Sequence, residues 1–365
     1  MTDNFYHQLE KPIVGLAPMD GVTDQPFRQI VQKYGDPDLI YTEFTNVEGL
    51  CHGAVRLLRP LLYDPSQRPI IAQFFGKTPS AFHQAAVLAA ELGFDGIDIN
   101  MGCPARQVAN HGSGAGLIKT PDLAQEIVQA VKQGVVDWVN GAGCTDCSDL
   151  TTEICQMVKK RQDDLVLRTN QQAEQRQPLP ISIKTRTGYH RAQIDTWLPA
   201  LINVEPAAIT IHGRTVKQGY SGQADWGLIK QAADLIHQAG ILVFGNGDVA
   251  DRQEAEGKAE QYGVDGVLIG RAAQGNPFVF AQPNPLKNLN DREQAQKLAQ
   301  VALEHARLYE RSFQDQEKYH FLPMRKHLAW YIESIPYAKK IRQKLVRTNN
   351  SQEVEQVLSE WGLLN

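Results

Sequence analysis

The sequence predicts an α/β fold, a closed (β/α)8 TIM barrel followed by an all-helical C-terminal domain. Eight short β-prone segments recur up to residue 270, and segments of helical period follow them. The eight segments are Ile13–Ala17, Asp38–Glu43, Ile70–Phe75, Gly96–Asn100, Ile181–Thr185, Ala207–Ile211, Ile241–Gly245 and Gly263–Gly270. Most are near-continuous apolar runs, as expected for parallel strands that are buried on both faces. An open doubly wound sheet is the alternative, but eight βα units are the number that closes a barrel.

The end of the chain has a helical period and no strand signal. The segment Gln282-Pro-Asn-Pro285 is typical of a linker, so we expect a barrel over residues 1–281 and a helical domain over residues 282–365. Within the helical domain, the spacing of apolar residues predicts helices over Ala338–Val346 and Val354–Trp361.

Inside the barrel, apolar spacing predicts helices over Ser80–Leu92 and Pro121–Val131. The connection between the fourth and fifth strands is much longer than the others, which leaves an insertion from about residue 134 to residue 178. A connection from a helix to the next strand returns to the amino-terminal end of the barrel, whereas chemistry sits at the carboxyl-terminal end. We therefore expect this insertion to lie outside the catalytic site.

Composition excludes several classes of protein. Hydrophobic residues make up 42% of the chain and charged residues 21%, which is typical of a folded globular protein rather than a disordered one. No apolar run reaches the ~18 residues that a membrane span needs, and the amino terminus lacks the features of a secretion signal. The five cysteines do not suggest a disulfide framework. We expect a cytoplasmic protein with no membrane association and no stable protein partner.

The charge is distributed unevenly along the chain. The net charge of −4 excludes a uniformly basic nucleic-acid-binding protein. Between Lys318 and Arg347, however, eight Lys or Arg residues stand against one acid, and aromatic residues lie among them. Such a stretch is usually a solvated helix face, but its single sign makes a surface for RNA or DNA an equal alternative.

The predicted strands end in polar or small residues, and in a barrel these ends meet at one mouth. The residues are Pro18, Met19, Asp20, Gln73, Asn100, Cys103, Lys184, Arg186, His212, Asn246, Gly247, Asp248, Gly270 and Arg271. Glycines after the seventh and eighth strands let the backbone approach phosphate oxygens, and these two loops form the usual phosphate site of such barrels. Taken alone, the loop after the first strand is an ordinary turn, and His212 also fits a buried core histidine.

Lys184 and Cys103 are the reactive groups of this mouth. An unpaired buried ammonium is costly, so Lys184 suggests a task such as stabilising an anionic reduced flavin. Cys103 has three possible roles. A nucleophile needs a lowered pKa, a metal ligand needs companions that the mouth lacks, and a general acid needs a carbon that becomes basic. The alternative to these three roles is a buried thiol with no chemical role.

Cys144 and Cys147 form a single CxxC motif, and Cys155 follows eight residues later. A structural zinc site would require a fourth ligand, which is not evident nearby in the sequence. Structural thiols are the preferred interpretation, ahead of zinc binding and redox activity. No metal site is expected.

Taken together, the motifs resemble the tRNA-dihydrouridine synthase family. The block Asp98-Ile-Asn-Met-Gly-Cys-Pro104 is close to diagnostic for it. The other matching segments are Ala17–Asp24 with Phe27-Arg28, Thr42-Glu-Phe44, Gln73, Gly112–Gly116, Lys184-Thr-Arg186, His212–Thr215, Asn246-Gly-Asp248 and Gly270-Arg271. They occur in the family's order, and the tail segment Arg325–Trp330 is similar to the family's tRNA-binding helical domain.

The resemblance implies an FMN enzyme that reduces a specific uridine of tRNA to 5,6-dihydrouridine, with NADPH as reductant. Cys103 would protonate uracil C5 after hydride transfer to C6, and Asn100 and Arg186 would contact the uracil. The remaining mouth residues would hold the cofactor. Pro18, Met19, Asp20, Gln73, Lys184 and His212 would lie at the flavin ring, and Asn246, Gly247, Asp248, Gly270 and Arg271 at its ribityl phosphate.

The sequence differs from the family's pattern at two places, and two other functions are considered as alternatives. The insertion is not typical of the family, and Arg106 stands where many members have a lysine. An FMN barrel oxidoreductase that acts on a free pyrimidine, similar to dihydroorotate dehydrogenase, is the alternative enzyme, but it has no use for a basic helical tail. An RNA-binding chaperone without catalysis would not need Cys103 and Lys184.

Overall fold

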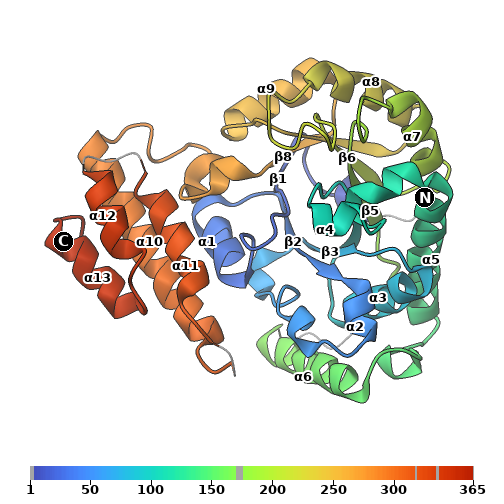
Figure 1. Ribbon diagram of the computed structural model, residues 1–365, viewed down its shortest axis with the longest axis horizontal. Coiled ribbons are helices and arrows are strands. Elements are labelled where there is room, and N and C mark those ends of the chain that lie inside the picture. The colour runs from blue at the N-terminus through green and yellow to red at the C-terminus, as the bar shows by residue number, and fades with distance from the viewer. Residues whose placement is uncertain (1–3, 170–175, 317–318, 334–336, 365) are drawn as a thin grey trace.

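The computed structural model describes residues 4–169, 176–316, 319–333 and 337–364. Residues 170–175 of the expected insertion and Lys318 of the basic stretch lie outside the described residues. Eight parallel strands form a closed barrel in which each strand pairs with the next one along the chain and β1 pairs with β8 (Figure 1). The predicted barrel is confirmed. The strands are β1 (Ile13–Leu16), β2 (Leu39–Asn46), β3 (Ile70–Phe75), β4 (Gly96–Met101), β5 (Ile181–Arg186), β6 (Ala208–His212), β7 (Leu242–Asn246) and β8 (Gly266–Ile269).

Helices follow the strands along the chain, and most of them lie around the outside of the barrel (Figure 1). They are α1 (Gln25–Gly35), α2 (Val47–Cys51), α3 (Pro79–Glu91), α4 (Arg106–Ala109), α5 (Pro121–Val139), α6 (Thr152–Thr169), α7 (Ile194–Ile202), α8 (Trp226–His237) and α9 (Arg252–Tyr262). Asp24, Asp225 and Asp251 begin α1, α8 and α9 by accepting backbone N–H bonds of the first turn, which satisfies donors that a helix start leaves unpaired. These caps set where each loop of the mouth gives way to a helix.

The helix α5 extends further than the sequence predicts. We expect a helix over Pro121–Val131 and take Gly134 as the start of an insertion, but α5 continues to Val139. Gly134 marks a close contact instead, because a Cβ there would lie 2.3 Å from the carbonyl oxygen of His83 in α3. The glycine lets two helices approach each other, so the insertion begins only after α5.

The insertion covers part of the outer surface of the barrel. Its helix α6 packs beside α3, and Gln162 donates to the carbonyl oxygen of Glu91 at 2.8 Å. Arg161 donates to the carbonyl oxygen of Leu58 at 2.7 Å, in the connection between β2 and β3. These contacts attach α6 to the side of the barrel (Figure 1).

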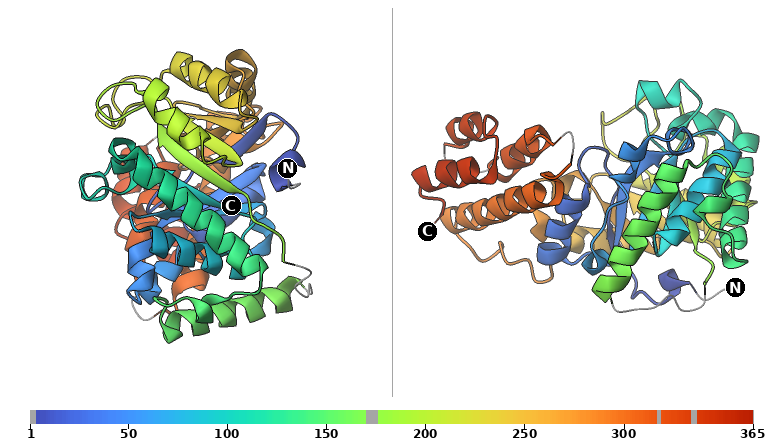
Figure 2. Two further views of the ribbon diagram at one scale, coloured as in Figure 1. Left: turned by 90° about the vertical axis from the view of Figure 1, so that its right-hand side faces the viewer. Right: turned by 90° about the horizontal axis from the view of Figure 1, so that it is seen from below.

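The C-terminal helices form a second layer with their own apolar core. They are α10 (Asp291–Phe313), α11 (Leu322–Tyr331), α12 (Ala338–Leu345) and α13 (Ser351–Glu360), and the two helices predicted last in the chain are confirmed. The core of this layer continues onto the barrel through Ile30 of α1 and Phe278. In the right-hand view of Figure 2, the last helices lie on the same side of the molecule as α4. None of the described helices has both the length and the apolar character that crossing a membrane would require.

Candidate active site

The strand register brings the predicted residues together at the carboxyl-terminal mouth of the barrel. Asn100 of β4 pairs with Lys184 of β5, and Arg186 pairs with His212 of β6. His212 in turn pairs with Asn246 of β7. Neighbours in register project to the same level of the barrel. Asn100 and Lys184 therefore share one level, and Arg186, His212 and Asn246 share a second level two residues further along the strands.

A chain of side-chain amides leads from a buried carboxylate to Cys103. Gln73 donates from Nε2 to Oδ2 of Asp98 at 2.7 Å, and Asn100 donates from Nδ2 to Oε1 of Gln73 at 2.9 Å. Oδ1 of Asn100 then accepts the backbone N–H groups of Gly102 at 3.1 Å and Cys103 at 2.9 Å. A carboxylate only accepts and a backbone N–H only donates, so both ends of the chain fix the orientation of the two amides.

Asp98 lies fully buried beneath this mouth. Burial raises its pKa to about 6, although the hydroxyl of Ser182, which donates to Oδ1 at 2.6 Å, and the amide of Gln73 stabilise the anion. Lys184 also favours the charged form of Asp98. The sequence motif contains Asp98, but its role as the anchor of the amide chain is evident only in the structure.

Lys184 presents a partly desolvated ammonium to the mouth. Its Nζ donates to Oδ1 of Asn246 at 2.9 Å, and Nδ2 of Asn246 donates to the carbonyl oxygen of Leu268 at 2.8 Å. Burial and the nearby guanidinium of Arg186 lower the pKa of Lys184 to about 7. A lysine poised in this way gains its charge readily when an anionic group arrives.

Arg186 is buried, and it holds the backbone around Cys103. Its Nε donates to the carbonyl oxygen of Gly102 at 2.7 Å, next to the thiol residue. One terminal nitrogen donates to the carbonyl oxygens of Thr215 at 3.2 Å and Gly219 at 3.1 Å. The structure thus shows Arg186 tying the loop after β6 to the end of β4.

Asp248 joins the loops after β6, β7 and β8. Its two carboxylate oxygens accept from Arg214 at 2.5 Å and from Arg271 at 2.9 Å. These cations and the backbone N–H of Ala224 hold the pKa of Asp248 below its usual range, against the opposing effect of burial. Arg214 belongs to the segment His212–Thr215 at the end of the sixth strand, but its pairing with Asp248 is not predicted by the sequence, because this partner lies 34 residues further along the chain.

His212 is a buried neutral imidazole. Burial and the cations around it, Lys184 first among them, hold its pKa far below the usual range. Its Nε2 lies 3.3 Å from a terminal nitrogen of Arg214. Gly247 packs directly on this ring: it has a φ of +121°, and a Cβ there would lie 2.9 Å from Cδ2 of His212 and 2.7 Å from Ala224. Only glycine fits at this point of the loop after β7.

The loops after β1 and β8 meet above the mouth. A Cβ at Gly270 would lie 3.6 Å from Sδ of Met19, at ordinary contact distance. The amide of Gln274 lies 3.9 Å from the same sulfur. Pro18 and Met19 are partly exposed, and Asp20 is exposed. The loop after β1 therefore packs against the loop after β8 through Met19.

Cys103 carries a partly exposed thiol at the end of β4. Burial raises its pKa, and Asp20 acts in the same direction, whereas the backbone at Ala105 and the charge of Arg186 oppose them. A raised pKa keeps the thiol protonated at neutral pH, which suits a proton donor and does not suit a nucleophile. The loop that follows packs on it, since a Cβ at Gly114 would lie 3.3 Å from Cβ of Cys103.

Tyr220 is an exposed aromatic residue at the rim, and reasoning on strand ends did not select it. Its side chain is 62% exposed, although most aromatic residues of the protein are buried. The guanidinium of Arg271 lies 5.1 Å from the centre of its ring. Its place between two glycines, Gly219 and Gly222, in the loop after β6 is the sequence signal that could have identified it.

The other cysteines lie in or beside the insertion. Cys144 and Cys147 are buried, Cys51 and Cys155 are partly buried, and all four are free thiols. Burial raises the pKa of each, which makes them unreactive. Within the described ranges of the chain, His, Cys, Asp and Glu side chains form no group of three or more that could hold a metal ion.

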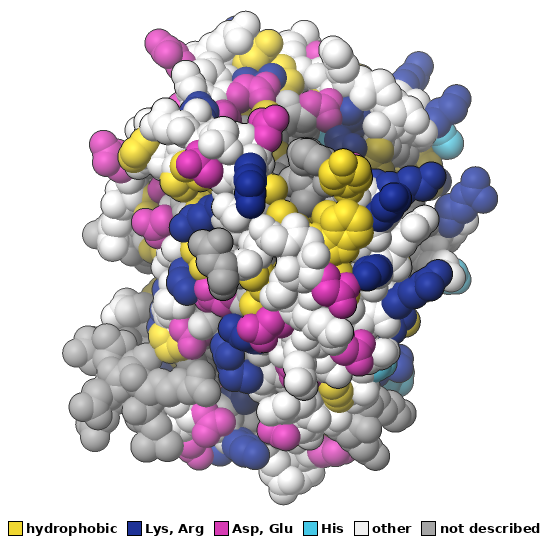
Figure 3. Space-filling model, turned by 90° about the vertical axis from the view of Figure 1, so that its left-hand side faces the viewer, with side chains coloured by type: hydrophobic (Ala, Val, Ile, Leu, Met, Phe, Trp, Pro, Cys, Tyr) yellow, Lys and Arg dark blue, Asp and Glu magenta, His cyan; other side chains and the backbone are white. Residues whose placement is uncertain are grey.

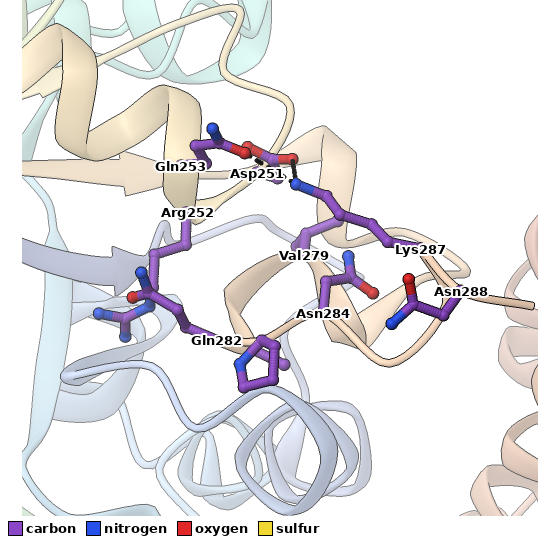
Figure 4. Close-up of a pocket in the computed structure, with 10 residues that line it drawn as sticks. Asp251, Arg252, Gln253, Val279, Gln282, Asn284, Lys287 and Asn288 are labelled. Atoms are coloured by element: carbon purple, nitrogen blue, oxygen red, sulfur yellow. Dashed lines mark hydrogen bonds and ion pairs between the residues drawn. The ribbon is translucent and has the colours of Figure 1, made fainter.

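A surface pocket lies apart from this mouth, between the start of α9 and the linker to the C-terminal helices (Figure 4). Its charged side chains have partners within the protein. Lys287 donates to Gln253 at 2.8 Å and lies 3.7 Å from Asp251, and Arg252 pairs with Asp38 at 2.9 Å. The pocket is thus bounded by paired groups that tie the linker to the barrel.

Comparisons with known proteins agree with this arrangement. Residues 15–161 and 159–362 match the model of a family described as "Dihydrouridine synthase (Dus)". A protein of Staphylococcus aureus (strain COL) named "Probable tRNA-dihydrouridine synthase" is 33% identical over 371 residues, which cover 99% of this chain and 96% of that protein. A protein of Bacillus subtilis (strain 168) named "Probable tRNA-dihydrouridine synthase 2" is 32% identical over 368 residues, which cover 99% and 97% of the two chains.

Proposed function

Because the chain belongs to the dihydrouridine synthase (Dus) family, we propose that it reduces a uridine of tRNA to 5,6-dihydrouridine with bound FMN and NADPH as reductant. The observation that carries this proposal is the hydrogen-bonded chain from Asp98 through Gln73 and Asn100 to Cys103. It places a thiol that stays protonated beside an amide of fixed orientation, at the mouth of a barrel. That pairing suits protonation of a held base.

The residues of the mouth fit FMN. Gly270 has no Cβ, and a Cβ at this position would lie 3.6 Å from Sδ of Met19. The room that is left lets a flat ring approach the loops after β1 and β8. Gln73, Lys184 and His212 would surround that ring, together with Pro18, Met19 and Asp20. Arg271, with Asn246, Gly247 and Gly270, would hold the ribityl phosphate, since cations and backbone N–H groups are what phosphate requires. Asp248 would lie at the same place and orient the guanidinium of Arg271, which it binds at 2.9 Å. When bound, FMN supplies the hydride for the reaction.

The side chains on the substrate side have separate tasks. Asn100 would donate its second amide hydrogen to a uracil carbonyl, because the first is used by Gln73. Cys103 would give its thiol proton to C5 of the uracil as C6 receives hydride, which leaves a saturated C5–C6 bond. Arg186 would contact the uracil while it holds the carbonyl oxygen of Gly102.

We also propose that residues 282–365 form the tRNA-binding domain and residues 1–281 the catalytic domain. A uridine must be extruded from the tRNA to reach the mouth of a barrel, so the rest of the tRNA has to be gripped by its backbone. On α12, Lys339 and Lys340 are exposed and Arg342 is partly exposed. In the part of the chain that the structure describes, no ion pair engages these three cations. Figure 3 shows Lys and Arg side chains gathering toward one side of the face that the C-terminal helices form.

The test starts from the purified full-length protein. We expect it to be yellow and to release FMN on denaturation, and we expect tRNA to reoxidise the reduced protein. Orotate and free uracil serve as the competing substrates. Reoxidation by orotate but not by tRNA would favour an enzyme of free pyrimidines, whereas a protein that cannot be loaded with FMN would contradict both enzymes.

A further inference from the structure

We propose that α11 of the C-terminal helices is a structural part of the flavin site, and that Lys326 is a positioning residue for the loop that follows β1. This inference rests on the proposed function, because it assumes that FMN occupies the mouth. It assigns the C-terminal helices a second task besides holding tRNA. Two contacts from α11, made to two different loops of the mouth, carry the argument.

The first contact joins α11 to the loop after β1. The ammonium of Lys326 donates to the carbonyl oxygen of Gly21, 305 residues away in the sequence. Gly21 has a φ of +68°, and a Cβ there would lie 3.2 Å from Nζ of Lys326. Gly21 directly follows Met19 and Asp20, which are predicted to lie at the flavin ring. Lys326 therefore supports this loop from the C-terminal helices.

The second contact joins α11 to the loop after β8. Gly275 has a φ of +75°, and a Cβ there would lie 2.4 Å from the carbonyl carbon and oxygen of Trp330. The loop backbone thus lies directly against the last turn of α11. Gln274, one residue earlier, lies 3.9 Å from the sulfur of Met19. The two loops and α11 form one connected unit above the mouth.

Packed side chains between α11 and the barrel hold α11 in place against the loops after β1 and β8. The ring of Phe27 in α1 lies 5.4 Å from that of His327 in α11 and 5.9 Å from that of His305 in α10. Lys33 of α1 pairs with Glu304 of α10 at 2.6 Å. Both histidines are buried, so α11 cannot shift without disturbing a packed interface. The position of the flavin loops then depends on the C-terminal helices.

Arg325 provides a matched control, because it is the neighbouring cation on the same helix. It donates to the carbonyl oxygen of Thr348 at 3.0 Å and to the side chain of Asn349 at 2.8 Å, both within the C-terminal helices. Removing its charge disturbs α11 without touching the barrel. A difference between variants at 325 and 326 therefore reports on the contact to the flavin loop.

The experiment measures the dissociation constant of FMN, by quenching of its fluorescence, for the full-length protein stripped of flavin. We expect Lys326→Met to weaken FMN binding about tenfold or more, as for removal of a charge-assisted hydrogen bond. Lys326→Arg can still donate to Gly21 and should stay within about threefold of the wild type, and Arg325→Ala within about twofold. Lys326→Gln is measured in parallel, so that poor folding of one variant does not leave the question open. The visible circular dichroism of bound FMN should change in Lys326→Met and Lys326→Gln, and it should not change in Lys326→Arg or Arg325→Ala.

Equal FMN affinity in Lys326→Met and the wild type would overturn this inference, even if tRNA binding fell. An equal weakening in Arg325→Ala would also overturn it, because the effect would then come from general destabilisation of α11. If the wild-type protein itself binds no FMN, the proposed function fails instead. The two failures are thereby distinguished.

Discussion

The backbone N–H of Cys103 donates to Oδ1 of Asn100 at 2.9 Å, so the residue proposed to protonate the substrate is held by the residue proposed to recognise it. Asn100 is in turn oriented by Gln73, and Gln73 by the buried Asp98. One hydrogen-bonded chain thus sets both the position of Cys103 and the orientation of the Asn100 amide. Rate enhancement by a positioned acid depends on this kind of preorganisation.

Cys103→Ala should lower the rate of dihydrouridine formation by about 10²-fold to 10⁴-fold, the usual contribution of a general acid. FMN content should not change, because the residues proposed to hold the flavin are all intact in this variant. The measurement is dihydrouridine formed per minute in a defined tRNA. Cys155→Ala removes a thiol outside the mouth and should keep full activity; full activity in Cys103→Ala would refute the acid role.

We expect Lys184 to make the affinity for FMN dependent on pH. The pKa of Lys184 is lowered to about 7 by burial, so the ammonium that an anionic flavin prefers is lost as the pH rises from 7 to 9. The dissociation constant of reduced FMN, whose ring is anionic, should therefore rise with pH in this range, by up to about tenfold per pH unit. Titrations at several pH values check this. Lys184→Met should bind FMN weakly and without this dependence, and a flat profile in the wild type would contradict the assignment.

Neutralising Lys339, Lys340 and Arg342 together by alanine should weaken tRNA binding. For each phosphate that the variant no longer neutralises, the slope of log affinity against log salt should become shallower by about 0.7 to 0.9. Filter binding at several salt concentrations measures both quantities. Lys159→Ala with Lys160→Ala, on the outer surface at α6, is the control and should change neither. An unchanged slope in the α12 variant would remove this helix from the interface.

Two glycines inside helices should respond to alanine with opposite signs. Gly134→Ala places a Cβ 2.3 Å from the carbonyl oxygen of His83 and should destabilise the protein by about 1–3 kcal/mol through overpacking. Gly257 is exposed in α9, and a Cβ there meets nothing within 4 Å, so Gly257→Ala should stabilise by up to about 1 kcal/mol. Urea unfolding of the two variants measures the difference. A stable Gly134→Ala would show that α3 and α5 can separate at no cost.

The strands and the residues at their ends could be predicted from the sequence, because both depend on local pattern. Buried parallel strands are apolar runs, and the polar residues that end them follow directly in the chain. Gly134 shows the limit of such reasoning, because the sequence does not distinguish a glycine that ends a helix from a glycine that lets two helices touch. Only the position of His83 decides between them.

Contacts between distant parts of the chain could not be predicted in this way. Arg214 donates to Asp248, which is 34 residues away in the sequence. Lys326 donates to Gly21, which is 305 residues away. Neither pair shares a periodicity or a motif, so their roles depend on how the loops meet after folding. The basic stretch is a similar case, because Lys326 turns out to contact the barrel while Lys344 pairs with Glu360 at 2.7 Å. Charge counting along the sequence treats all of these cations alike.

The most direct test of the central claim is the nucleoside composition of an unmodified tRNA transcript after incubation with the FMN-loaded protein and NADPH. Mass spectrometry of the digested tRNA should show dihydrouridine at a defined uridine, and Cys103→Ala should leave that uridine almost unchanged. If the protein holds FMN and oxidises NADPH but the tRNA contains no dihydrouridine after the incubation, the claim is contradicted.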